Sequence, residues 1–138
     1  MEKCLKDEKE TVDFGRQVAS QVESPFVIYL QGDLGAGKTT WVRGFLSGFG
    51  HLGTVKSPTF TLVEEYSFGS TFIYHFDLYR LTHPAELQQI GIEEYFKPAS
   101  IVIIEWPEQG QGFLPDPDLI LSFAIVDAGR IVTINKDV

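Results

Sequence analysis

The chain has 138 residues and one cysteine, so we expect a single domain covering residues 1–138, without an internal disulfide. Its formal net charge is −8, which argues against direct binding of nucleic acid, because such binding depends on lysine and arginine. No apolar run approaches the ~20 residues of a membrane span, and the single cysteine fits a reducing compartment, so we expect a cytoplasmic protein with no membrane contact.

The first part of the chain predicts two helices around one buried strand. Apolar residues at helical spacing predict one helix over Thr11–Val22 and another over Thr39–Phe49. Phe26–Leu30 is a continuous apolar run, which is typical of a strand buried on both faces of a parallel sheet. A glycine-rich segment, residues 31–37, links this strand to the second helix.

The middle of the chain is rich in strand-forming residues. Phe60–Tyr66 and Thr71–Phe76 are expected to pair as a hairpin. The spacing of apolar residues predicts a helix over Pro84–Phe96, with proline in its first turn. Ile101–Ile104 is entirely apolar and predicts a second buried strand.

Residues 32–39 match the phosphate-binding pattern G-x-x-x-x-G-K-[ST] in full, and they lie between a buried strand and an amphipathic helix, as that motif requires. The glycines allow a tight path on which backbone N–H groups converge on phosphate oxygens. Lys38 supplies a charge to the β- and γ-phosphates, and the Thr39 hydroxyl is placed to ligate magnesium. We therefore predict a site for ATP and magnesium, with nucleotide contacts from Gly32, Asp33, Leu34, Gly35, Ala36, Gly37, Lys38, Thr39 and Thr40.

The end of the chain completes the predicted fold. Leu119–Val126 and Ile131–Ile134 are expected to form a terminal hairpin, because a short polar segment with glycine separates two apolar runs. With the phosphate loop, the elements predict a single α/β domain of the P-loop NTPase type. Its sheet is expected to be mixed but mostly parallel, flanked by helices, with the β-hairpin at the C-terminus.

A carboxylate at the end of a neighbouring strand usually completes such a site by orienting magnesium directly or through water. Two positions qualify, Glu105 after Ile101–Ile104 and Asp77 at the end of the strand before it. The residues leave open which of them dominates, so both are candidate metal ligands together with Thr39. His75 alternates with apolar neighbours and is interpreted as a packing residue. The sequence contains no Cys/His cluster, which excludes a zinc site.

Three further segments follow the phosphate loop in a specific order, namely Ser57–Phe60, His75–Leu81 and Glu105–Pro107. Together with residues 32–39 they resemble the tRNA threonylcarbamoyladenosine biosynthesis ATPase family, TsaE, over nearly the whole chain. The resemblance implies a weak magnesium-dependent ATPase that is required to form threonylcarbamoyladenosine beside the anticodon of tRNA. It also implies ATP-dependent binding to the TsaB–TsaD pair, which transfers the threonylcarbamoyl group, and contact with tRNA only through that pair.

The same resemblance implies roles for single residues. Ser57–Phe60 would be a switch-like loop that senses the γ-phosphate, and Thr59 in this loop would join Lys38, Asp77 and Glu105 as a catalytic residue. An aromatic side chain would lie near the nucleotide or the partner surface, and adenine would lie between the N-terminal segment and the terminal hairpin. The nucleotide contacts implied in this way are Glu8, Thr11, Trp106 and Arg130.

Two other functions stay open from the residues alone. A small-molecule P-loop kinase would need arginines over the transferred phosphate, and the four arginines in the chain are Arg16, Arg43, Arg80 and Arg130. An assembly module that binds nucleotide without hydrolysing it would use the same residues as a weak ATPase. The sequence therefore does not separate switching from hydrolysis.

Overall fold

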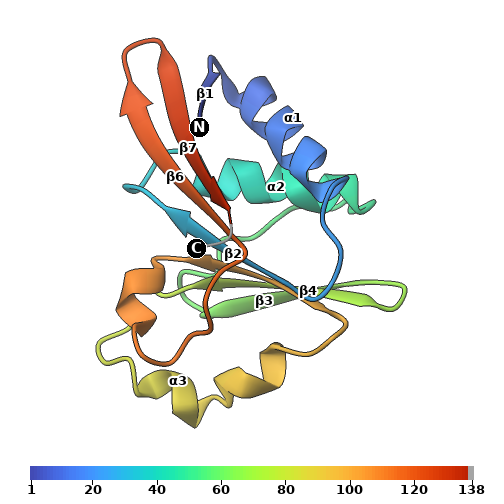
Figure 1. The fold of residues 1–138 in the computed structure, drawn as a ribbon, viewed down its shortest axis with the longest axis vertical. Helices are drawn as coiled ribbons and strands as arrows, with labels where there is room; N and C mark the ends of the chain where they lie inside the picture. The colour runs from blue at the N-terminus through green and yellow to red at the C-terminus, as the bar shows by residue number, and fades with distance from the viewer. Residues whose placement is uncertain (137–138) are drawn as a thin grey trace.

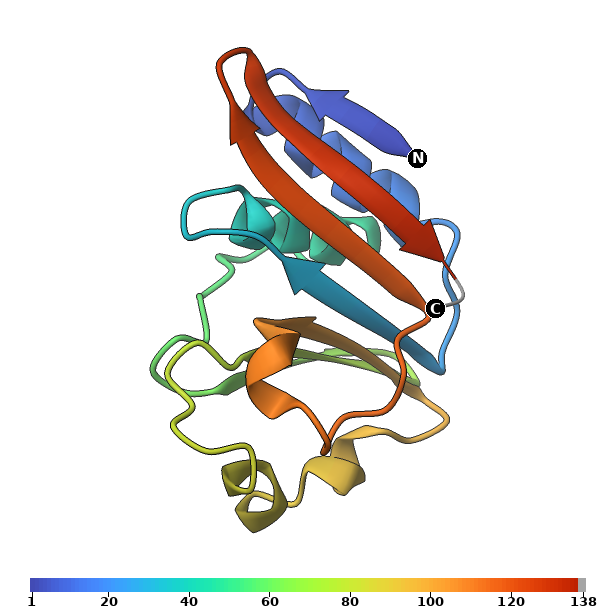
Figure 2. The same ribbon diagram turned by 60° about the vertical axis from the view of Figure 1, so that its left-hand side comes forward.

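The computed structural model describes residues 1–136, which form one sheet flanked by helices (Figures 1 and 2). Along this sheet the described strands follow the order β1-β7-β6-β2-β5-β4-β3. The strands are β1 (Glu2–Leu5), β2 (Phe26–Gln31), β3 (Val63–Phe68), β4 (Thr71–Asp77), β5 (Ser100–Glu105), β6 (Leu119–Val126) and β7 (Gly129–Lys136). The helices are α1 (Glu8–Ala19), α2 (Lys38–Gly48) and α3 (Glu86–Gln89), with short 3₁₀ helices η1 (Ile92–Tyr95) and η2 (Pro107–Gly110).

The centre of the sheet is parallel and its two edges are antiparallel. Strand β2 pairs in parallel with β5 and β6, and β5 pairs in parallel with β4. The pairs β1–β7, β6–β7 and β3–β4 are antiparallel. The predicted α/β fold with a mixed sheet and a C-terminal hairpin is confirmed. The sheet is not mostly parallel as predicted: between the described strands three pairings are parallel and three are antiparallel, because hairpin partners and β1 extend both edges. All of β5 is buried, as its apolar run predicts.

Helices cover the sheet on two sides. Helices α1 and α2 pack over one apolar cluster, which includes Trp41 of α2 and Ile103 of β5. Helix α3 and η1 pack over the other cluster, which includes Leu87 of α3 and Ile104 of β5. Neighbouring residues of β5 belong to different clusters because successive side chains of a strand point to opposite faces. The sheet therefore separates two apolar layers.

The two long helices touch through their backbones. A Cβ atom on Gly44 of α2 would lie 2.1 Å from the carbonyl oxygen of Val12 in α1. A Cβ atom on Gly15 of α1 would lie 2.3 Å from the carbonyl oxygen of Trp41 in α2. Neither distance leaves room for a side chain, so glycine is required for the helices to approach this closely.

Two predicted helices have different bounds in the structure. Helix α1 begins at Glu8 because the Asp7 carboxylate accepts a hydrogen bond from the Glu10 backbone N–H, at 2.9 Å, and so caps the helix. The prediction of a continuous helix over Pro84–Phe96 is wrong. Helix α3 and η1 are separate, because Gly91 between them has a φ of 71°, in the left-handed region that ends helices.

Two strands also differ from their predicted bounds. Strand β3 begins at Val63 rather than Phe60, because residues 58–62 form a turn in which the Leu62 backbone N–H donates to the Pro58 carbonyl at 2.8 Å. Strand β1 is not predicted by its own residues. It forms by antiparallel pairing with β7, in which Leu5 lies opposite Arg130.

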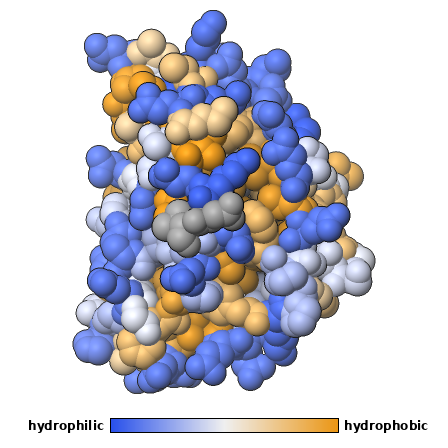
Figure 3. Space-filling view, in the orientation of Figure 1, coloured by the Kyte–Doolittle hydropathy of each residue, from blue (hydrophilic) through white to orange (hydrophobic). Residues whose placement is uncertain are grey.

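The visible surface is mainly polar, with apolar patches between the hydrophilic residues (Figure 3). This pattern agrees with a composition of 43% hydrophobic and 22% charged residues, because folded proteins expose some apolar surface beside their charged residues. In the part of the chain that the structure describes, none of the helices has the length and apolar character needed to cross a membrane.

The phenol of Tyr29 on β2 is expected to make folding stability sensitive to alkaline pH. Its hydroxyl donates a hydrogen bond to the Pro115 carbonyl, and burial, with a smaller contribution from Asp116, raises its pKa from 10.0 to about 12. The folded protein therefore keeps this proton while the unfolded chain releases it, so stability is lost as pH rises from 10.0 towards 12. Urea unfolding across this range should show a steeper loss for the wild type than for Tyr29→Phe, and equal slopes would contradict the assignment.

Candidate nucleotide-binding site

The glycine-rich loop joins the end of β2 to the start of α2, as the phosphate-binding motif requires. Gly32, Gly35 and Gly37 have φ angles of 135°, 79° and 106°, which other residues rarely adopt. Gly37 immediately precedes α2, so the loop leads into the unpaired backbone N–H groups of the helix N-terminus. These three glycines provide the backbone conformation that the motif predicts.

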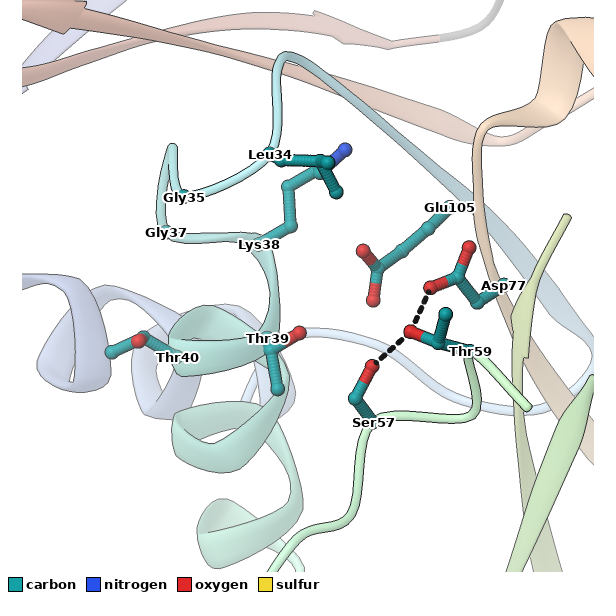
Figure 4. Close-up of a pocket in the computed structure, with 10 residues that line it drawn as sticks. All are labelled: Leu34, Gly35, Gly37, Lys38, Thr39, Thr40, Ser57, Thr59, Asp77 and Glu105. Carbon is teal, nitrogen blue, oxygen red and sulfur yellow. Dashed lines mark hydrogen bonds between the residues drawn. The ribbon is translucent and has the colours of Figure 1, made fainter. Parts of the chain in front are cut away.

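A cavity of about 190 Å³ opens between this loop and the ends of β4 and β5. Figure 4 shows the loop and Lys38 on one side of it, and Asp77 and Glu105 on the other. The lining residues are Leu34, Gly35, Gly37, Lys38, Thr39, Thr40, Ser57, Thr59, Asp77 and Glu105. The structure thus brings the loop motif, the switch-like segment and both predicted acids to one place.

The two acids lie side by side at the ends of parallel strands. Asp77 of β4 and Glu105 of β5 are register partners, and they are 4% and 3% exposed. Thr59 Oγ1 and the Tyr79 backbone N–H donate to the two oxygens of Asp77, each at 3.0 Å. Because Thr59 donates to Asp77, the Ser57 hydroxyl at 2.8 Å must donate to Thr59. The switch-like segment is therefore connected to a buried carboxylate through hydroxyl groups.

The donor set suits magnesium bound together with a nucleotide. Carboxylates of Asp77 and Glu105 and the hydroxyl of Thr39 line the same cavity, and magnesium prefers oxygen ligands of this kind. Among residues 1–136 there is no group of three or more His, Cys, Asp or Glu residues that could hold a metal by themselves. Magnesium in phosphate-transfer sites is usually held by one or two carboxylates and by the phosphates, so the residues present fit that ion.

Lys38 is held inside the site by neutral groups. Its ammonium group donates to the Gly32 carbonyl and lies 4.1 Å from the centre of the Trp106 ring. Burial lowers the pKa of Lys38, and the negative charges of Glu105 and Asp77 oppose this effect only in part. An anion in the cavity would favour the charged lysine, so the site is electrostatically suited to a phosphate.

Trp106 has a strained backbone beside the site. Its φ is 58°, a left-handed conformation that is uncommon for a residue other than glycine. The ring packs against Tyr79, with 4.9 Å between ring centres, and it also contacts the Lys38 ammonium group and the apolar cluster under α3. The aromatic residue implied by sequence is therefore in contact with the loop lysine, although it does not line the cavity.

A second cavity of about 190 Å³ adjoins the first. It shares Gly35, Gly37 and Thr40 with the first cavity and extends between the N-terminal segment and the β6–β7 hairpin. The implied adenine contacts Glu8, Thr11 and Arg130 all line it. The structure therefore brings these three residues together at the far side of the phosphate loop.

The second cavity is held in shape by contacts to its charged residues. Arg130 donates to the Gly35 carbonyl at 3.2 Å, which ties the terminal hairpin to the phosphate loop. Glu8 forms an ion pair with Arg43 of α2. Its carboxylate is thus already engaged by a neighbour within the protein.

Three predicted nucleotide contacts from the loop line neither cavity. Gly32 acts through its backbone, which accepts the hydrogen bond from Lys38. Ala36 is fully buried, and its backbone N–H donates to the Asp33 carbonyl at 3.1 Å. Asp33 therefore contributes to the turn through its backbone.

Comparison of the sequence and the fold with those of known proteins identifies the family of this chain. A family model described as threonylcarbamoyl adenosine biosynthesis protein TsaE matches residues 5–132. The chain belongs to the TsaE family. A relative from Haemophilus influenzae, named tRNA threonylcarbamoyladenosine biosynthesis protein TsaE, is 50% identical in an alignment 131 residues long that covers 91% of this chain and 83% of the relative.

More distant members of the TsaE family match in the same way. A Bacillus subtilis protein of the same name is 38% identical over 111 residues, which are 80% of this chain and 69% of that protein. A crystal structure of YdiB from that organism superposes with a TM-score of 0.83 at 30% identity, covering 99% of this chain and 84% of the other. The resemblance stated from sequence is confirmed at the level of family and fold.

Sequence reasoning missed several residues of the site in this TsaE-family chain. Leu5, Lys6, Asp7 and Gly129 line the second cavity, but they belong to no motif and come together only through the pairing of β1 with β7. The alternation of His75 with apolar residues predicts its burial and a packing role, but it gives no signal of a further contact. In the structure the Nε2 atom of His75 lies 2.6 Å from Oε2 of Glu105.

Proposed function

We propose that this protein is a weak, magnesium-dependent ATPase that acts in the cytoplasm in forming threonylcarbamoyladenosine beside the anticodon of tRNA. The observation that carries the ATPase proposal is the joining of Lys38 and Thr39 to two buried carboxylates in one cavity. The tRNA role is supported by membership of the TsaE family and by the names of its relatives.

The residues of this chain have separate tasks in that proposal. The loop amides and Lys38 bind the phosphates, and the second cavity beside the loop takes the nucleoside end, so the two adjoining cavities suit one elongated nucleotide. When bound, magnesium would neutralise part of the phosphate charge. Thr39 and the carboxylates of Asp77 and Glu105 are the groups that would hold it.

The switch-like segment gives the site a way to respond to the state of the nucleotide. Thr59 lines the phosphate cavity and donates to Asp77, so a change in phosphate contacts at Thr59 alters a hydrogen bond to a buried acid. The neighbouring Phe60 is 83% exposed, and Arg80 lies 4.5 Å from its ring centre. The segment therefore extends from the phosphate cavity to the surface.

We further propose that the ATP-bound protein binds the TsaB–TsaD threonylcarbamoyl-transferase complex, and that it reaches tRNA only through that complex. The exposed side of the switch-like segment supports a protein partner whose binding depends on the nucleotide. The net charge of −8 supports indirect contact with tRNA.

Multiple-turnover formation of modified tRNA tests this function. TsaB–TsaD, tRNA and the threonylcarbamoyl donor are combined with ATP, with or without the protein, and product is counted per transferase. We expect repeated turnover only when the protein and hydrolysable ATP are both present. Equal turnover without the protein would refute the role.

Two controls separate hydrolysis from switching. Binding of TsaB–TsaD should be retained with a non-hydrolysable ATP analogue, whereas repeated turnover should be lost. If turnover continues with the analogue, the protein is an assembly module that uses nucleotide binding alone.

A further inference from the structure

His75 lies directly behind the paired acids. It is two residues before Asp77 on β4, so both side chains are on the same face of the strand. In the parallel pairing of β4 with β5, His75 is opposite Ile103 and Asp77 is opposite Glu105. The imidazole therefore lies two residues deeper in the sheet than the two carboxylates, and it is fully buried, with 0% exposure.

The imidazole is bonded to only one of the two acids. Its Nε2 atom is 2.6 Å from Oε2 of Glu105. An ionised carboxylate can only accept, so Nε2 carries the proton when Glu105 is ionised. The Nδ1 atom is buried and has no hydrogen-bond partner among residues 1–136. An apolar residue would fill this core position without burying an unpaired polar atom, so packing alone does not account for histidine here.

Glu105 is a residue whose orientation matters to the site. Its side chain lines the phosphate cavity with Lys38 and Asp77, and it is 3% exposed. Asp77 is fixed by donors to both of its oxygens, whereas the side-chain hydrogen bond described for Glu105 comes from His75. Without that bond, the longer glutamate side chain has rotamers that turn its carboxylate away from the cavity.

We propose that His75 is a positioning residue, which holds the Glu105 carboxylate toward the phosphate cavity through the Nε2–H···Oε2 hydrogen bond. This inference rests on the proposed function, because it assigns Glu105 to magnesium bound with the nucleotide. Hydrogen bonds to a metal-ligating carboxylate fix its direction, and their loss typically weakens metal affinity about 10–100-fold.

The magnesium dependence of nucleotide binding tests this role. Affinity for a fluorescent ATP analogue is measured with magnesium and with a chelator, and the ratio of the two affinities is compared between variants. For His75→Leu we expect the ratio to fall about tenfold or more, with little change in the chelator arm, because the loop amides and Lys38 are untouched. For His75→Gln, whose amide nitrogen reaches about the place of Nε2, we expect most of the ratio to be kept.

A coupled variant separates positioning from general damage. In a Glu105→Gln background, His75→Leu should not lower the affinity ratio any further, since the carboxylate that His75 orients is already absent. A wild-type ratio in folded His75→Leu would overturn the proposal, as would equal weakening in both arms. If His75→Leu does not fold, His75→Asn supplies the same comparison, because its shorter amide does not reach Glu105.

A measurement on the nucleotide-free protein gives an independent readout. The chain has three histidines, so their ring nitrogens can be followed separately by ¹⁵N NMR. We expect one ring with a protected Nε2–H whose signal shifts in Glu105→Gln, and an unprotonated Nδ1. An unchanged ring signal would overturn the inference. Failure of the wild type to bind nucleotide with magnesium would instead refute the proposed function, so the two failures are distinguishable.

Discussion

Replacing Lys38 with alanine is expected to abolish ATP hydrolysis and to weaken nucleotide binding by about 10- to 100-fold. Lys38 is the only cationic residue among those that line the phosphate cavity in the described part of the chain. Hydrogen bonds to charged groups contribute roughly 1.5–3 kcal/mol each, and about 1.4 kcal/mol corresponds to a tenfold change in affinity. Calorimetric titration with ATP and magnesium measures binding, and phosphate release measures hydrolysis.

The loss should not come from unfolding. Alanine loses the contacts of Lys38 with the Gly32 carbonyl and the Trp106 ring, but it also removes an ammonium group whose pKa is lowered by burial and whose charged form the fold therefore disfavours, so the two effects oppose each other. We therefore expect the melting temperature of Lys38→Ala to stay close to the wild-type value. Lys9→Ala is the matched control, since it removes the same charge from an exposed side chain on α1. Wild-type hydrolysis by Lys38→Ala would exclude the proposed site.

Replacing Gly44 with alanine is expected to destabilise the protein by about 3 kcal/mol, which corresponds to a fall in melting temperature of roughly 10 °C. The new Cβ atom would lie 2.1 Å from the Val12 carbonyl oxygen and 2.7 Å from its carbon, so α1 and α2 would have to separate. Alanine is favoured over glycine inside a helix by only about 1 kcal/mol, so the steric overlap should dominate. Thermal and urea unfolding measure the change.

Gly53→Ala is the matched control for this substitution. A Cβ atom there would lie 3.4 Å from Nε2 of His51, which belongs to a side chain that can move, and no backbone atom lies in the way. We expect a change in unfolding free energy within about 0.5 kcal/mol. If Gly44→Ala were as stable as Gly53→Ala, the backbone contact between the helices would not contribute as described.

The parts of the fold that sequence predicts well are those with a strong local signal. Ile101–Ile104 is continuously apolar and forms the buried β5, and the motif at 32–39 gives both the loop and the start of α2. The helix predicted over 84–96 fails because apolar spacing continues across Gly91, whose left-handed backbone interrupts it. The spacing of apolar residues indicates which face of a helix is buried, but it does not indicate where the helix is interrupted.

The parts of the site that sequence misses depend on contacts between distant segments. The hydrogen bond of His75 to Glu105 spans 30 residues of sequence and follows from the pairing of β4 with β5. Likewise, Leu5 meets Arg130 only because β1 joins the sheet edge beside β7. A four-residue strand carries too little pattern to be recognised before its partner is known.

The contact between α1 and α2 fixes the spacing of the two ends of the ligand site. Glu8 begins one helix beside the second cavity, and Lys38 begins the other beside the phosphate loop. Since the backbones touch at Gly15 and Gly44, neither helix can slide without a clash between main chains. In the proposed site, an adjustment to the state of the nucleotide would therefore fall to the opposite wall of the cavity, where the hydroxyl groups of Ser57 and Thr59 lie on a loop.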